Sequence, residues 1–191
     1  MKSLILALVL LFLLGSHAAL PDDVLLPTKE ESGFAALDGY LSANAQPAKG
    51  EVLGITGFFG PSSPGHWLIL CRMGKSGGTL WESAWKDGVI LHQRILPVLP
   101  GQDVPDLPVL RESLRIDSGA VFLAATQLAT ERKVAFEYVR YQLRVRDAGR
   151  EPVWMVSLLS RSQVQVGLLY FSAASGTLLR ESWSQGGKGR S

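Results

Sequence analysis

Hydrophobic residues change their spacing along the first half of the chain, and the change separates a helix from strands. Phe34, Leu37 and Leu41 lie three and four residues apart, which predicts an amphipathic helix over residues 30–45. Pro47 and Gly50 then end it. Short runs of apolar, β-branched and aromatic residues follow, with glycine- and proline-rich turns between them. These runs predict three strands, at residues 52–59, 67–73 and 79–85.

The second half of the chain repeats this order, with helical spacing of apolar residues followed by strand-like runs. Residues 117–131 predict a helix that begins beside Asp117, whose carboxylate favours a helix N-terminus. Three strand-like runs come after it, joined by a turn at residues 147–150 and another at residues 160–162. The predicted strands are residues 135–146, 153–160 and 163–173.

Four short matches between the halves occur in the same order and at nearly constant separation, which is typical of a tandem duplication. They pair Glu31-Ser32-Gly33 with Asp117-Ser118-Gly119, Gly65–Ile69 with Pro152–Val156, Trp81–Ala84 with Tyr170–Ala173, and Gly88–Leu91 with Gly176–Leu179. One helix can cover the apolar face of a three-stranded sheet. The sequence therefore predicts an α+β fold of two tandem helix-plus-antiparallel-sheet repeats.

The same pattern divides the chain into segments. Four prolines between residues 97 and 108 indicate a stiff connection between the repeats, and the polar, glycine-rich C-terminus indicates disorder. The predicted segments are a signal peptide at 1–18, a first α+β repeat at 19–96, a Pro-rich linker at 97–115, a second repeat at 116–183 and a tail at 184–191.

The second repeat resembles a PepSY-type domain. The resemblance lies in the helix 117–131, the long hairpin 136–160 and the closing run 167–179, although Ser172 stands where that family usually has Asp. A tandem of such units is similar in architecture to the β-lactamase inhibitor proteins. The resemblance implies a non-enzymatic, exported module that binds or restrains another protein, often a peptidase.

The N-terminus has the three parts of a secretory signal. Lys2 is followed by the apolar run Leu4–Leu14, and the small residues Ser16 and Ala18 precede a cleavage site after Ala18. The run is shorter than the roughly 20 residues of a membrane span, and no cysteine lies beside the site to carry a lipid anchor. We therefore expect an exported protein, periplasmic or extracellular, without a stable membrane anchor.

Charge argues against nucleic acid as a partner, because the formal net charge is only +2. The charge is uneven, however. Acidic residues are in excess up to Leu110, and basic residues are in excess from Arg111 onward. Opposite fields on the two halves can steer a protein partner or attract each other.

Residues that could support catalysis are few. After removal of the signal, His66 and His92 are the remaining histidines, and Cys71 is the single cysteine. None of the three has a histidine or cysteine at the spacing of a metal site, and no Gly-x-Ser-x-Gly motif marks a nucleophile. We expect no enzyme activity, no metal and no cofactor.

Two surfaces remain as candidates for a partner. On the strand 135–146, alternate residues form a basic stripe with one aromatic side chain: Tyr138, Arg140, Arg144 and Arg146. The stripe is either a solvated sheet face or a docking face for an acidic partner. Trp81 and Trp85 share one side of their strand and are either an interface or core side chains beneath the helix.

These observations favour a binding protein over an enzyme. The expected function is an exported, non-enzymatic protein that holds another protein or peptide, for example as an inhibitor or modulator of a peptidase. The alternative is a small-ligand or lipid carrier in the periplasm, with an apolar pocket between helix and sheet. The sequence leaves the oligomeric state open.

Overall fold

The structure is a computed structural model. It describes residues 31–43, 50–74, 79–97, 104–105, 107–146 and 150–184. The predicted signal peptide, part of the predicted linker and all but one residue of the predicted tail lie outside the described residues.

Two α-helices form where the sequence predicts them. Helix α2 spans Gly33–Ser42, and the hydroxyl of its N-cap residue Ser32 accepts a hydrogen bond from the amide of Ala35. Helix α3 spans Ser118–Glu131 and has Asp117 as its N-cap. A short 3-10 helix, η1, spans Arg111–Ser113 between them.

Eight β-strands accompany the helices. The predicted strands correspond to β1, β2, β3, β5, β6 and β7, whereas β4 and β8 are additional. Their bounds are β1 Glu51–Gly60, β2 Trp67–Met73, β3 Thr79–Lys86, β4 Val89–Leu96, β5 Tyr138–Arg146, β6 Glu151–Leu159, β7 Gln165–Ser172 and β8 Leu178–Trp183.

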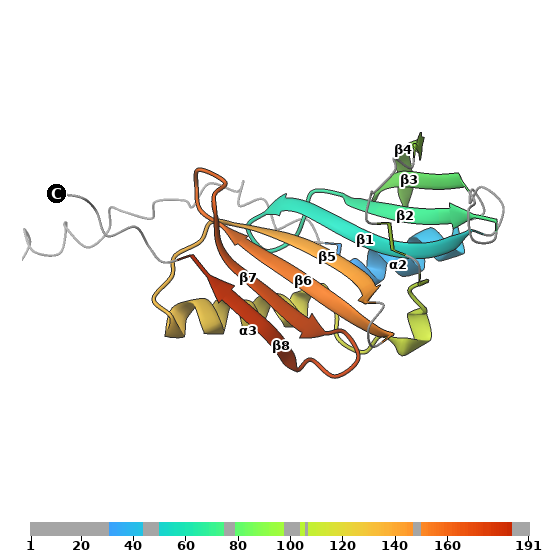
Figure 1. Ribbon diagram of the computed structural model, residues 1–191. Helices are drawn as coiled ribbons and strands as arrows, with labels where there is room; N and C mark the ends of the chain where they lie inside the picture. Colours follow the sequence, from blue (N-terminus) through green and yellow to red (C-terminus); the bar gives the residue numbers. More distant parts are fainter. Residues whose placement is uncertain are drawn as a thin grey trace, which may run out of the picture.

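The predicted fold class, two helix-plus-sheet repeats, is wrong. All eight strands form one antiparallel sheet in the order β4-β3-β2-β1-β5-β6-β7-β8, so the fold is dominated by a single sheet (Figure 1). Each helix is followed by four strands instead of three.

The junction between β1 and β5 explains why the sheet is continuous. These strands pair antiparallel from Gly54 opposite Arg144 to Gly60 opposite Val139. A strand edge with unpaired backbone N–H and C=O groups can pair with other chains and cause aggregation. Here the backbone groups of β1 and β5 pair with each other instead. Local sequence patterns report strands but do not reveal this long-range pairing.

Strand β4 follows β3 through the two-residue turn Asp87-Gly88. Both residues have positive φ, 48° and 84°, as a tight Asp-Gly hairpin requires. The ladder between β3 and β4 shifts register between Ala84 and Trp85. This irregularity breaks the apolar–polar alternation that would have predicted β4.

Both helices lie on one face of the sheet (Figure 1), where α2 contacts β1, β2 and β3 while α3 contacts β6 and β7. Their N-termini are joined by side chains, because Ser118 Oγ accepts from the amide of Gly33 and Asp117 Oδ1 accepts from the amide of Phe34. The face beneath them forms one contiguous core with three fully buried tryptophans: Trp67, Trp85 and Trp154.

Part of the predicted linker packs against this body. Val109 and Leu114 are buried, and the amide of Val109 donates to the carbonyl of Val52. Arg111 forms an ion pair with Asp38 of α2 and stacks over Phe34. These contacts fasten η1 to α2.

Candidate functional site

The sheet face opposite the helices, called the open face below, carries the predicted basic stripe. Along β5, Val139, Tyr141, Leu143 and Val145 are buried beneath the helices. The alternate residues of the strand point to the other side and are half-buried or exposed. The predicted division of β5 into an apolar and a basic side is therefore confirmed.

Cross-strand register shows which residues share the open face with β5. One row crosses five neighbouring strands, and its members are half-buried apart from an exposed arginine at its end. The row is Thr56, Gln142, Met155, Tyr170 and Arg180. A second row includes Arg140, Ser157, Leu168 and Ser182.

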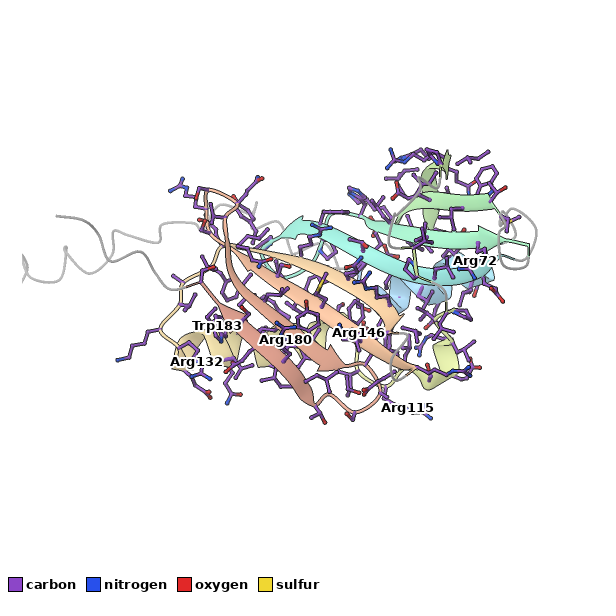
Figure 2. The ribbon with its side chains drawn as sticks, in the orientation of Figure 1. Arg72, Arg115, Arg132, Arg146, Arg180 and Trp183 are labelled. Carbon is purple, nitrogen blue, oxygen red and sulfur yellow. The ribbon has the colours of Figure 1, made fainter. Side chains whose placement is uncertain are left out.

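Arginines on this face stack on aromatic rings. The guanidinium carbon of Arg140 lies 4.7 Å from the ring centroid of Phe58 in β1. Arg146 and Arg180 approach the Tyr170 ring at 5.4 and 6.0 Å. Figure 2 labels Arg146 and Arg180 over this half of the sheet. Such cation–π contacts contribute about 0.5–1 kcal/mol each at exposed sites and favour these side-chain positions.

Positive charge is concentrated on the β5–β8 half of the open face. Among the described residues of these strands, Glu151, opposite Arg146, is the acidic side chain on this face. The β1–β4 half differs. There, Arg94 pairs with Glu82 at 2.5 Å. Arg72 is buried, lies 3.9 Å from Glu51 and donates to the carbonyl of Pro105.

The structure separates the predicted partner-binding residues into two groups. Tyr138, Arg140, Arg144 and Arg146 lie together on the open face. Trp81 is half-buried on the opposite side of the sheet, between Cys71 and Ile95 in the register.

Trp85 is a core residue and takes no part in a surface. Its side chain is 1% exposed, and its indole nitrogen donates to Glu31 Oε1 at 2.8 Å. The prediction of Trp85 as a partner-binding residue is therefore wrong, and the alternative, a core side chain beneath the helix, is confirmed. The physical reason is that α2 crosses β3 at this point, with Gly39 directly above the ring.

Three members of the arginine–aromatic contacts on this face were not among the predicted partner-binding residues: Phe58, Tyr170 and Arg180. Tyr170 alternates with the buried residues Leu169 and Phe171, so its outward direction was readable from the strand pattern. Its position beside Arg146 was not, because the side chain of Arg146 reaches across β6. Arg180 lies on β8, a strand that the sequence pattern did not predict.

Cys71 lies in a buried polar group beneath α2. Its thiol donates to the hydroxyl of Tyr40 at 3.4 Å, and that hydroxyl lies 3.3 Å from Ser83 Oγ. Burial raises the pKa of the Cys71 thiol. Burial, together with the hydrogen bond from Cys71, raises the pKa of Tyr40 to about 12. Both groups therefore stay protonated at neutral pH, which does not favour a nucleophile.

Metal-binding and membrane-spanning features are not found in the described part of the chain. No cluster of three histidine, cysteine, aspartate or glutamate side chains there could hold an ion. No helix among the described residues is long and apolar enough to cross a bilayer. Comparison of the chain with family models, curated proteins and solved structures finds no match.

Proposed function

We propose that the chain is an exported, non-enzymatic protein that binds another protein on the open face of its sheet. The observation that carries the proposal is the contrast between the two faces. One is covered by α2 and α3 over a closed core, and the other presents arginines stacked on half-buried aromatic rings. Arginine and aromatic side chains are enriched where proteins bind one another.

Export is supported by the N-terminal pattern of Lys2, Leu4–Leu14 and Ala18. A peptidase is the partner class that the PepSY resemblance of residues 117–179 implies. Binding without catalysis is supported by the buried, protonated Cys71, the one thiol of the chain.

The packing beneath α2 favours the open face over an internal carrier pocket. A Cβ atom at Gly39 would lie 2.6 Å from Trp85, and one at Gly33 would lie 2.6 Å from Trp154. The helix backbone therefore rests directly on the tryptophan rings. A ligand between helix and sheet would have to displace this contact, whereas a ligand on the open face would not.

Site-specific photo-crosslinking in the producing cell tests the proposal. A benzophenone amino acid replaces Ser182, an exposed residue of the open face, or Leu123, which is 70% exposed on α3. We expect a discrete protein adduct from position 182 and none from position 123. No adduct from position 182, or the same adduct from both positions, would contradict the proposal.

A further inference from the structure

Three arginines on the β5–β8 half of the open face lie over aromatic rings. Arg140 stacks on Phe58, while Arg146 and Arg180 both lie against Tyr170. All three arginines are exposed. They form two separate stacks, called the Phe58 stack and the Tyr170 stack below.

A guanidinium that lies against a ring keeps its N–H edge available. When an arginine lies over a ring with the flat face of its guanidinium, the donors in the plane of the group can still form paired hydrogen bonds to a carboxylate. Stacking also removes part of the side-chain entropy that an unsupported arginine loses on binding. The two stacks therefore suit planar, two-oxygen acceptors better than they suit a general negative charge.

The spacing of the stacks requires an extended ligand. Arg140 and Arg146 are six residues apart on β5, which separates their Cα atoms by about 20 Å at 3.4 Å per residue. Polar and apolar side chains lie between the stacks, among them Gln142 and Met155. A single small carboxylic acid cannot reach both ends.

We propose that the two stacks bind an acidic protein segment that presents carboxylate side chains at both ends of this strip. The inference rests on the proposed function and adds the chemistry of the partner. Charge supports it, because Arg140, Arg146 and Arg180 share this half with one acidic side chain among the described strand residues, Glu151. On the other half, Arg94 is paired with Glu82.

The same geometry disfavours nucleic acid as the occupant. Single strands bind to sheets largely by stacking bases on aromatic side chains. Here guanidinium groups already lie over Phe58 and Tyr170. The chain's formal net charge of +2 is also low for binding through phosphates.

A labelled peptide of about twelve alternating glutamate and serine residues is a suitable probe, since it spans about 40 Å when extended. Its affinity for the mature protein is measured by fluorescence anisotropy at low and moderate salt. The decisive variant is Arg146→Lys with Arg180→Lys, which keeps the charge but removes the paired donors and the stacked group. The control is Arg161→Lys in the exposed turn between β6 and β7.

We expect the double lysine variant to bind the peptide about tenfold more weakly than the wild type, because lysine cannot form the paired hydrogen bonds that arginine makes to a carboxylate. Arg161→Lys should bind as the wild type does. Equal affinity of the double variant would overturn the inference, and so would tighter binding of a single-stranded oligonucleotide of equal charge. If position 182 forms a crosslink while the double lysine variant binds the peptide as the wild type does, the proposed function stands and only the acidic nature of the partner is contradicted.

Discussion

Trp67 and Trp154 make equivalent hydrogen bonds at the starts of two different helices, and their rings pack edge to face. The indole nitrogen of Trp67 donates at 3.0 Å to the carbonyl of Glu31, which precedes the N-cap of α2. That of Trp154 donates at 2.7 Å to the carbonyl of Ile116, which precedes the N-cap of α3. The ring centroids lie 6.3 Å apart. Each tryptophan thus fixes one helix start, and the contact joins both within a single core.

A double-mutant cycle on these tryptophans tests whether the core is single. Trp67→Phe and Trp154→Phe should each lower the free energy of unfolding by about 1–3 kcal/mol, because each removes a hydrogen bond and part of a buried ring. In urea unfolding, the double variant should depart from additivity by about 0.5–1.5 kcal/mol. Additive losses, or two separate transitions, would indicate independent halves.

Gly39→Ala should destabilise the protein although alanine favours helix. The new methyl group would lie 2.6 Å from Trp85, which is fully buried and held by Glu31. Overpacking of this kind costs about 1–3 kcal/mol, against a gain of up to about 1 kcal/mol in helix propensity. The matched control is Gly119→Ala in α3, where a Cβ meets nothing within 4 Å. A thermal melt should show a lower Tm for the first variant and an unchanged or higher Tm for the second.

Glu31 connects the start of α2 to the turn between β3 and β4. Its carboxylate accepts from the indole nitrogen of Trp85 at 2.8 Å and from the amide of Asp87 at 3.0 Å. Glu31→Ala should lower the free energy of unfolding by about 1–3 kcal/mol, since the part-buried indole N–H loses its acceptor. Glu31→Gln, which retains one oxygen acceptor, should lose less. Equal stability of Glu31→Ala and the wild type in urea would show that the contact is unimportant.

Stability should fall at alkaline pH because of Tyr40. Its pKa is raised from 10.0 to about 12 in the folded protein, so the unfolded chain releases this proton first. The stabilisation is complete below pH 10 and is lost as the pH rises through 12. A shift of this size corresponds to a loss of roughly 2–3 kcal/mol. Tyr40→Phe should show a smaller decline between pH 9.5 and pH 12 in parallel urea titrations, and an identical decline would contradict the assignment.

Export can be tested at the N-terminus of the mature chain. The residues Ser16 and Ala18 before the cleavage site predict that the secreted protein begins at Ala19, or at Leu20 if the neighbouring site is used. Edman sequencing or intact-mass measurement of protein from the periplasm or medium checks this. Recovery of a chain that begins at Met1 from the membrane fraction would contradict it.

The sequence was sufficient for most local structure. Helical spacing located α2 and α3, and alternation on β5 separated the buried Tyr141 and Leu143 from the outward arginines. These features depend on neighbours within a few residues, so a periodic pattern predicts them. Strand β4 was not predicted because a register shift beside Trp85 interrupts its apolar–polar alternation.

Only the tertiary structure decided the sheet and the site. The pairing of β1 with β5 joins residues far apart in the chain, and backbone hydrogen bonds of that kind leave no periodic trace in side chains. Trp85 is a core residue because α2 crosses over it. Tyr170 lies beside the arginines because β7 follows β5 and β6 in the sheet. The sequence by itself determined which side chains each strand presents. Which of these side chains come into contact depends on the order of the strands in the sheet. Long-range strand pairing and the packing of two helices on one face determine that order.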